Sequence, residues 1–310
     1  MFKVPVLLIL YNRIEEAHNV FQVLKTIQPT QLYVAGDGCK AGNMLDRSRV
    51  YQTRCVIQPA WHCQLHTYWQ EEHLGKSQMM YQAMQWFFEQ EEEGVIIMED
   101  TIPSYDFFPY CEELLSRYRN DEHVFSIGGT YLRHRSRKRY NKRLKKGGSS
   151  YYFSAYATTW GFATWKNRWK DFTLSLSQYS NEDFANMVSP YMRKQKQKIY
   201  WLRRFAILKK HDIPYWDYQF NFHIWAHQGL CITPYLNLVT NIGFKKQPKR
   251  KIRRLKRNAY PIMPLTHPTK IEQNFKEDRY MFKHIFKRAF LYLFRDWLTE
   301  ILPNKNEQED

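Results

Sequence analysis

The sequence has few cysteines and no long hydrophobic run. Its five cysteines form an odd-numbered set without a Cys-x-x-Cys pair: Cys39, Cys55, Cys63, Cys111 and Cys231. This set argues against a disulfide framework and favours a reducing compartment. The apolar run near Val4 ends at Leu10, which is too short for a membrane span, and no small-residue cleavage site follows it. We therefore predict a first β-strand rather than a signal peptide, and a cytoplasmic location that extends to the inner face of the plasma membrane.

Two further classes of site lack their usual signatures. His62, Cys63 and His66 lie close together, as zinc ligands do, but a fourth ligand with suitable spacing is missing. The chain also has no zinc-finger spacing and no RNA-binding aromatic signature. We expect neither a zinc site at these residues nor a nucleic-acid partner.

Positive charge is the most extreme property of the composition. The formal net charge is +17, and Lys and Arg are densest in residues 133–146 and 245–257. Such runs attract anions, including anionic lipid headgroups and acidic glycolipids at a membrane surface. The alternative is a pair of solvated basic loops.

Strand and helix patterns alternate through the first 120 residues. Apolar runs and helical spacing predict strands at 4–10, 31–35, 64–69 and 94–99, and helices at 14–27, about 72–89 and about 105–118. This alternation is typical of an α/β protein with a mostly parallel central sheet flanked by helices. The loops after successive parallel strands meet at one edge of the sheet.

The strand that ends at residue 99 stops abruptly in two carboxylates, Glu99 and Asp100. In open α/β sheets, ligands bind in the crevice beyond the carboxyl ends of the strands. The two acids could hold a divalent cation or bind a sugar through hydrogen bonds. In the alternative interpretation, Asp100 or Ser104 caps the following helix.

The second half is more aromatic and more helical. We predict a strand at 124–127, a polar helix at 181–210, a helix opening at Pro214, a short strand at 237–244 and an amphipathic helix at 271–301. Trp160, Trp165 and Trp169 show helical spacing, which favours core packing, although aromatic faces also stack on sugars. The amphipathic helix could pack on the core or lie in a membrane interface. We divide the chain into a nucleotide-sugar-binding half at 1–130, a catalytic and acceptor-binding half at 131–260, and a C-terminal helix with a disordered acidic tail at 261–310.

Seven motifs, in order, resemble those of bacterial nucleotide-diphospho-sugar transferases. These glycosyltransferases have the GT-A fold, are haemolytic-protein-like, and are distantly similar to the N-acetylglucosaminyltransferases that build N-glycans. The likeness spans residues 4 to 280, and its motifs are 10–13 (LYNR), 35–38 (AGDG), 97–104 (IMEDTIPS), 152–154 (YFS), 160–165 (WGFATW), 216–219 (WDYQ) and 237–243 (NLVTNIG).

The resemblance implies which residues bind the nucleotide-sugar donor, which is expected to be a UDP-sugar. They are Tyr11, Asn12, Arg13, Asp37, Gly38, Gly75, Lys76, Glu99, Asp100, Trp160, Gly161, Lys245 and Lys246. Within this set, Asp37 would lie near the base, and Gly75 and Lys76 would face the ribose or diphosphate.

Two departures from the family pattern bear on the divalent metal, Mn²⁺ or Mg²⁺. Glu99 and Asp100 match the first two acids of the Glu-Asp-Asp signature, but Thr101 replaces the acid that holds the metal. Lys245 and Lys246 stand where the family has a histidine. A hydroxyl is a poorer cation ligand than a carboxylate. We therefore expect cationic side chains to neutralise the diphosphate, from the set Arg13, Lys76, Lys245, Lys246 and Lys249. The alternative is a metal site completed by Asp100 and water.

The resemblance also implies the reaction. Asp217 would be the base of an inverting hexosyl- or N-acetylhexosaminyltransferase that acts on a glycan or lipid-linked acceptor, as in lipopolysaccharide or capsule synthesis. Alternatively, Asp217 caps its helix. Two other functions compete with transfer. A sugar nucleotidyltransferase would usually carry a glycine-rich phosphate loop, which residues 10–17 lack, whereas Thr101 motivates an inactive nucleotide-sugar binder or basic adaptor.

Overall fold

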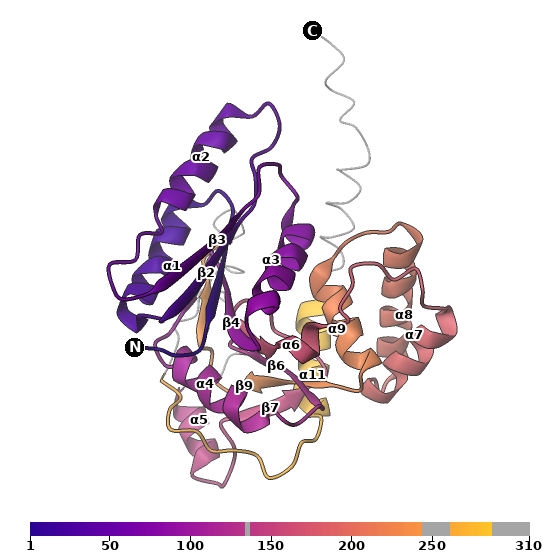
Figure 1. The fold of residues 1–310 in the computed structure, drawn as a ribbon. Helices are drawn as coiled ribbons and strands as arrows, with labels where there is room; N and C mark the ends of the chain where they lie inside the picture. Colours follow the sequence, from indigo (N-terminus) through magenta and orange to yellow (C-terminus); the bar gives the residue numbers. More distant parts are fainter. Residues whose placement is uncertain (134–136, 244–260, 287–310) are drawn as a thin grey trace.

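The computed structural model describes residues 1–133, 137–243 and 261–286 (Figure 1). A mixed eight-stranded sheet forms its centre, in the order β3-β2-β1-β4-β8-β6-β9-β7. In chain order, the strands are β1 (Val6–Leu10), β2 (Gln31–Gly36), β3 (Gln64–Trp69), β4 (Glu93–Met98), β6 (Val124–Gly128), β7 (Tyr151–Ser154), β8 (Phe162–Trp165) and β9 (Leu230–Pro234). Helices flank the sheet, and the predicted α/β class is confirmed.

The first four strands run parallel to one another. β1 lies between β2 and β4, and β3 pairs with β2 at the edge. All five residues of β1 are buried, because both faces of this part of the sheet are covered. Leu8 and Leu10 pack into one hydrophobic core, whereas Leu7 and Ile9 pack into the other. The predicted alternation of strand and helix is confirmed here.

Four helices belong to this half: α1 (Ile14–Ile27), α2 (Met44–Cys55), α3 (Lys76–Gln90) and α4 (Phe107–Tyr118). α1 has the predicted bounds and buries Ala17, Val20, Phe21 and Leu24 at helical spacing. The sequence pattern does not predict α2, because the only residues this helix buries are Asp46, Val50 and Thr53.

The second half adds antiparallel strands to the same sheet. β8 pairs antiparallel with both β4 and β6, and all four of its residues are buried. The helical spacing predicted from Trp160 to Trp169 is therefore wrong across β8, because a strand buried on both faces is apolar at every position. The predicted packing role is confirmed, since Trp165 and Trp169 are only 2% and 1% exposed.

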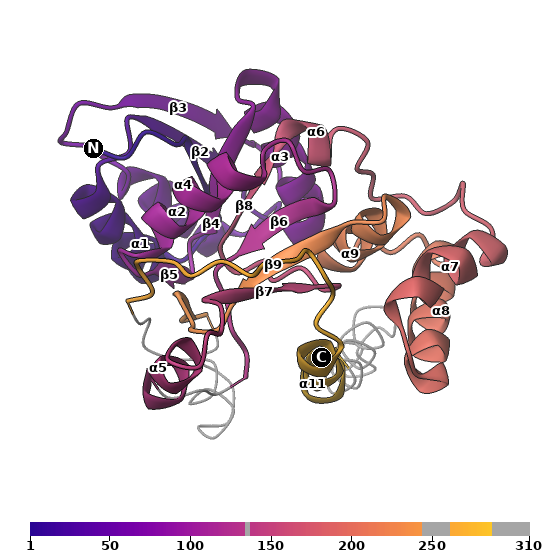
Figure 2. The same ribbon diagram turned by 90° about the horizontal axis from the view of Figure 1, so that it is seen from below.

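The second half contributes further helices. They are α5 (Arg137–Leu144), α6 (Lys166–Trp169), α7 (Asn181–Val188), α8 (Gln195–Lys210), α9 (Trp216–Ala226) and α11 (Phe275–Met281), with a 3-10 turn η1 (Ser189–Tyr191) and a π-helical turn η2 (Phe282–Phe286). Of these helices, α7 and α8 lie on the side of the molecule away from α2 (Figures 1 and 2). None of the described helices has both the length and the apolar character that crossing a bilayer requires.

Three predicted elements differ from those observed. Residues 137–144 of the first basic loop form helix α5. The helix predicted at 181–210 is divided into α7 and α8, because Pro190 lies in the intervening turn η1. In the C-terminal segment, helix α11 begins only at Phe275, and residues 287–301 lie outside the described part of the chain.

A small antiparallel ribbon joins the two halves near the acid pair. Strand β5 (Thr101–Pro103) follows the acids directly and pairs with β10 (Val239–Asn241). The backbone N–H of Ile242 donates to the carbonyl oxygen of Asp100 at 2.8 Å. The turn at 241–243 is therefore fixed beside Asp100.

Candidate functional site

A pocket of about 330 Å³ lies at the carboxyl ends of β1, β2 and β4. It is lined by Ile9, Leu10, Tyr11, Arg13, Asp37, Lys40, His73, Lys76, Met79, Met80, Met98, Glu99 and Asp100. The loops that the sequence predicts to converge do meet here. The functional roles implied for their residues remain predictions.

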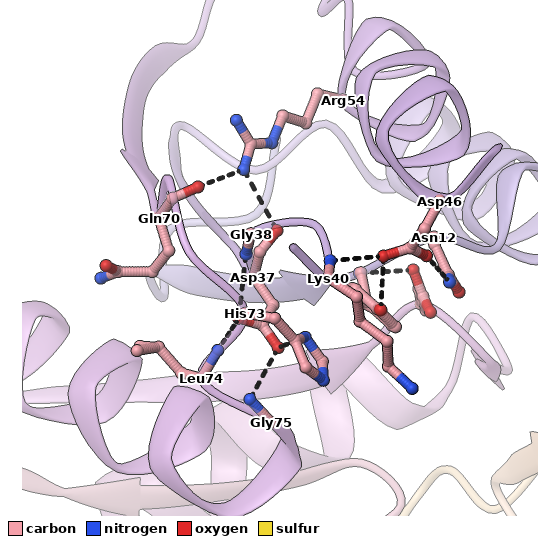
Figure 3. Close-up of polar contacts among 12 residues, drawn as sticks. Asn12, Asp37, Gly38, Lys40, Asp46, Arg54, Gln70, His73, Leu74 and Gly75 are labelled. Carbon is pink, nitrogen blue, oxygen red and sulfur yellow. Dashed lines mark hydrogen bonds and ion pairs between the residues drawn. The ribbon is translucent and has the colours of Figure 1, made fainter. Parts of the chain in front are cut away.

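Asp37 fixes the start of α3 (Figure 3). Its carboxylate is 3% exposed. Oδ1 accepts the backbone N–H groups of Gly38 and Leu74 at 2.9 and 2.8 Å, and Oδ2 accepts that of Gly75 at 3.0 Å. The Nδ1 atom of His73 lies 2.9 Å from Oδ2, which makes an ion pair when the ring is protonated. Asp37 therefore holds the pocket wall, and both of its oxygens already accept hydrogen bonds.

Gly75 and Gly38 are needed for this arrangement. Gly75 precedes the first residue of α3 with φ of +79°, a backbone conformation that glycine adopts without steric cost. A Cβ atom at Gly38 would clash with the backbone of Glu72. The loop after β2 thus passes directly against the chain that leads into α3.

Asp46 of α2 holds the loop after β1 in place through hydrogen bonds. Its carboxylate accepts hydrogen bonds from Tyr11 Oη at 2.8 Å, Asn12 Nδ2 at 2.6 Å and the backbone N–H of Lys40 at 2.8 Å. Burial acts to raise the pKa of Asp46, but these hydrogen bonds outweigh it and lower the pKa. The Tyr11 ring also stacks on His73, with 4.8 Å between ring centroids.

Arg54, near the end of α2, joins the second and third strands. Its Nη2 atom donates to the carbonyl oxygens of Asp37 at 3.1 Å and Gln70 at 2.7 Å (Figure 3). Its guanidinium lies 4.9 Å over the ring of Trp69, a cation–π contact. Helix α2 therefore positions two walls of the pocket.

Glu99 is a buried carboxylate at the tip of β4, with 7% exposure. Its Oε2 accepts the backbone N–H of Tyr11 at 2.7 Å and that of Arg13 at 3.4 Å. Burial raises the pKa of Glu99 to about 7, against the opposing effect of these N–H groups and of the Arg13 charge. Close to neutral pH, its charge therefore responds to small changes in its surroundings.

Asp100 forms an ion pair with Arg13. Arg13 Nη1 lies 2.7 Å from Asp100 Oδ2, and Arg13 Nε lies 3.7 Å from Glu99 Oε1. Gly243 packs against this ion pair so closely that a Cβ atom there would clash with both partners. Burial raises the pKa of Asp100, and the charges of Arg13 and Lys76 oppose the rise.

These residues do not fit a divalent cation. Thr101 is fully buried and its hydroxyl donates to the carbonyl oxygen of Met98 at 2.9 Å. Asp100 is already paired with Arg13. Across residues 1–133, 137–243 and 261–286, no group of three His, Cys, Asp or Glu side chains is arranged as a metal site. Of the earlier zinc candidates, His66 stacks on Tyr33, with 4.4 Å between ring centroids.

The remaining predicted residues either do not line this pocket or lie outside the described part of the chain. Trp160 and Gly161 immediately precede β8, which runs antiparallel to β4, so they lie at the edge of the sheet where β4 ends. They are not among the residues that line the pocket. Asp217 is half-buried in the first turn of α9. Lys245, Lys246 and Lys249 lie outside the described residues.

No protein-family model matches the chain, and no curated protein matches its sequence. Mouse xyloside xylosyltransferase 1, in its apo form, is similar with a TM-score of 0.33 and 8% identity, over 72% of this chain and 81% of that one. A putative glucose-1-phosphate thymidylyltransferase from Bacillus anthracis is similar with a TM-score of 0.33 and 13% identity, over 71% of this chain and 99% of that one. HddC from Yersinia pseudotuberculosis is similar with a TM-score of 0.30 and 9% identity, over 54% of this chain and 78% of that one. At these values the likeness is confined to parts of the α/β fold, and function has to be argued from this chain's own side chains.

Sequence reasoning misses three residues that shape the pocket: Lys40, Asp46 and His73. Asp46 has a local signal, because Asn43 accepts the backbone N–H of Asp46 at 2.9 Å and so caps α2. An Asn-x-x-Asp pattern before a polar stretch could have indicated this helix. No comparable local pattern marks His73, which reaches Asp37 only through the tertiary fold.

Proposed function

We propose that this chain is an inverting glycosyltransferase that transfers a sugar from a UDP-sugar to a glycan or lipid-linked acceptor, as in bacterial surface polysaccharide synthesis. The observation that supports it best is the pocket beyond β1, β2 and β4, where Asp37, Lys76, Glu99 and Asp100 come together. Pockets at this edge of an α/β sheet are the usual ligand sites. The order of the seven sequence motifs, which resembles that of nucleotide-diphospho-sugar transferases, is the reason for proposing a nucleotide sugar as the ligand.

The positive groups of the pocket suit a diphosphate. Arg13, Lys40 and Lys76 line it, and in the described part of the chain neither lysine forms an ion pair with a carboxylate. When the sugar–phosphate bond breaks, fixed positive groups stabilise the charge that develops on the departing UDP.

Asp217 is the proposed base. The backbone N–H of Trp216 donates to Ser77 Oγ at 3.3 Å, which brings the first turn of α9 beside the first turn of α3. The acceptor oxygen would attack the anomeric carbon as its bond to UDP breaks, and the hydroxyl proton would pass to the Asp217 carboxylate. UDP leaves with the bonding electron pair, so charge and atoms balance.

The first test is binding of UDP, UDP-glucose and UDP-N-acetylglucosamine, measured by thermal shift and calorimetry with EDTA or with Mn²⁺. We expect binding in EDTA and a loss of about tenfold in affinity for Lys76→Gln, as for removal of a charged contact. Lys3→Gln is the matched control, because Lys3 is exposed and does not line the pocket. Binding that requires Mn²⁺ would show that the arginine and lysines do not replace a metal.

The second test is turnover. Release of UDP from a bound UDP-sugar supports a transferase, whereas release of pyrophosphate from UTP and a sugar phosphate would identify a nucleotidyltransferase instead. A protein that binds UDP but turns over no donor with any acceptor would be an inactive binder, the alternative that Thr101 motivates.

A further inference from the structure

A second pocket of about 330 Å³ lies beside β7, the outermost strand at the end of the sheet away from β3. Its walls are the turn after α5, strand β7 and residues 267–274. Figure 2 shows α5 beside β7, and Tyr140 Oη donates to Ser150 Oγ at 3.0 Å between them. In the strand order β7 is five strands away from β1, so the two pockets are roughly 24 Å apart at ordinary strand spacing. The proposed transfer does not use this pocket.

Arg143 is held in place at the pocket wall. Its guanidinium lies 3.8 Å over the ring of Tyr235. Nε donates to the carbonyl oxygen of Ser149 at 3.1 Å, and Nη2 donates to Ser149 Oγ at 3.3 Å. Gly148 is required beside it, because a Cβ atom there would clash with Arg143. Within the described residues, Nη1 of Arg143 has no hydrogen-bond or carboxylate partner. A fixed guanidinium with unused donors is prepared to bind an oxyanion.

The charges around this pocket favour an anion. Residues 137–146 contain seven Lys or Arg and no acid. Glu272, the acid in the pocket lining, is 72% exposed and lies 3.7 Å from Lys270. His267 contacts Tyr151 Oη at 2.8 Å and Glu113 at 3.0 Å, so both of its ring nitrogens already have partners.

We propose that this second pocket binds a monosaccharide-sized anion, either a sugar phosphate or a sugar carboxylate, with Arg143 contacting the anionic group. Its volume of about 330 Å³ is enough for one sugar ring. Thr269 also lines it, and its exposed hydroxyl can bind a sugar hydroxyl. The same chemistry is found in soluble sugar phosphates and in the headgroups of phosphoglycolipids. The proposal does not depend on glycosyl transfer.

Calorimetry of the full chain with glucose 1-phosphate, galacturonate and neutral glucose tests the proposal. We expect at least one anionic sugar to bind and glucose not to bind. Arg143→Gln should weaken that binding roughly tenfold. Arg139→Gln is the matched control, because Arg139 is exposed on the same helix and does not line the pocket. Lys76→Gln should leave the binding unchanged, which separates this site from the donor pocket.

Arg143 also braces the turn at Ser149, so a second variant leaves it in place. Thr269 is an exposed lining residue, and Thr269→Trp should block the pocket and abolish binding. Binding to phosphatidylcholine vesicles with and without phosphatidylinositol 4-phosphate distinguishes a lipid headgroup from a soluble sugar phosphate. If the protein binds only the vesicles that contain phosphatidylinositol 4-phosphate, and Thr269→Trp abolishes this binding, the ligand is a lipid headgroup. The proposal is overturned if no anionic sugar binds, or if binding survives both Arg143→Gln and Thr269→Trp. Equal affinity for inorganic phosphate would refute the sugar component.

Discussion

Replacing Glu99 by glutamine should remove a pH dependence of stability that this carboxylate causes. Burial raises the pKa of Glu99 from its ordinary value of 4.5 to about 7. Between these values the folded chain binds more protons than the unfolded chain, so the free energy of unfolding falls as the pH rises through this window. The shift corresponds to about 3 kcal/mol, almost all of it lost above about pH 7.

The same charge should oppose binding of a diphosphate. A pKa near 7 leaves Glu99 about 90% protonated at pH 6 and about 10% protonated at pH 8. Two unit charges about 8 Å apart repel each other by about 2 kcal/mol at an effective dielectric constant of 20, and by about half of this after screening by salt. At that separation we therefore expect affinity for UDP-glucose to fall roughly threefold to fourfold from pH 6 to pH 8.

Urea unfolding and calorimetry with UDP-glucose, each at several pH values, measure both effects. UDP-glucose is the suitable ligand because its diphosphate does not titrate in this range. Buried Asp278, whose pKa is raised to about 6, titrates in part of the same window, so the informative quantity is the difference between wild type and Glu99→Gln. If that difference is flat between pH 5 and pH 8, Glu99 has an ordinary pKa and the reasoning fails.

Three further substitutions test other parts of the site. Asp217→Asn should lower turnover about 10²-fold to 10⁴-fold while UDP-glucose affinity and Tm stay unchanged, and wild-type turnover would remove the base assignment. Asp46→Ala should destabilise the fold by about 1–3 kcal/mol in urea unfolding, because Tyr11 and Asn12 lose their shared acceptor, and should weaken UDP-glucose binding; an unchanged affinity would show that α2 does not position the pocket. Gly38→Ala should lower stability by about 1–3 kcal/mol because its Cβ would clash with the backbone of Glu72, and a wild-type Tm would contradict that close approach.

The parallel half of the fold can be predicted from the sequence because its signals are local. An apolar run such as that of β1, followed by the buried stripe of α1, is visible without tertiary information. The convergence of Asp37, Lys76 and Asp100 follows from strand direction alone, since the carboxyl ends of parallel strands share one edge.

The rest depends on contacts between distant residues. The apolar residues of β8 and of the aromatic run around it do not recur at the spacing typical of a strand, because β8 lies between β4 and β6 and is buried on both faces. The carboxylate of Asp46 reaches Tyr11 from a helix with a mostly polar sequence. Arg13 could be predicted as a cation near the diphosphate, but its ion pair with Asp100 could not, because Gly243 closes that pair from the other half of the chain.

The carboxylates of Asp37 and Asp46 hold the loops around the pocket through hydrogen bonds, and other residues form its cationic surface. Lys40 and Lys76 contribute side chains to that surface, while the loops that carry them are anchored independently of those side chains. Exchanging either lysine should therefore change how tightly an anionic ligand binds without remodelling the loops. Ligand affinity at this pocket is then separable from the stability of the fold, which makes these two positions the natural starting points for redesigning the pocket.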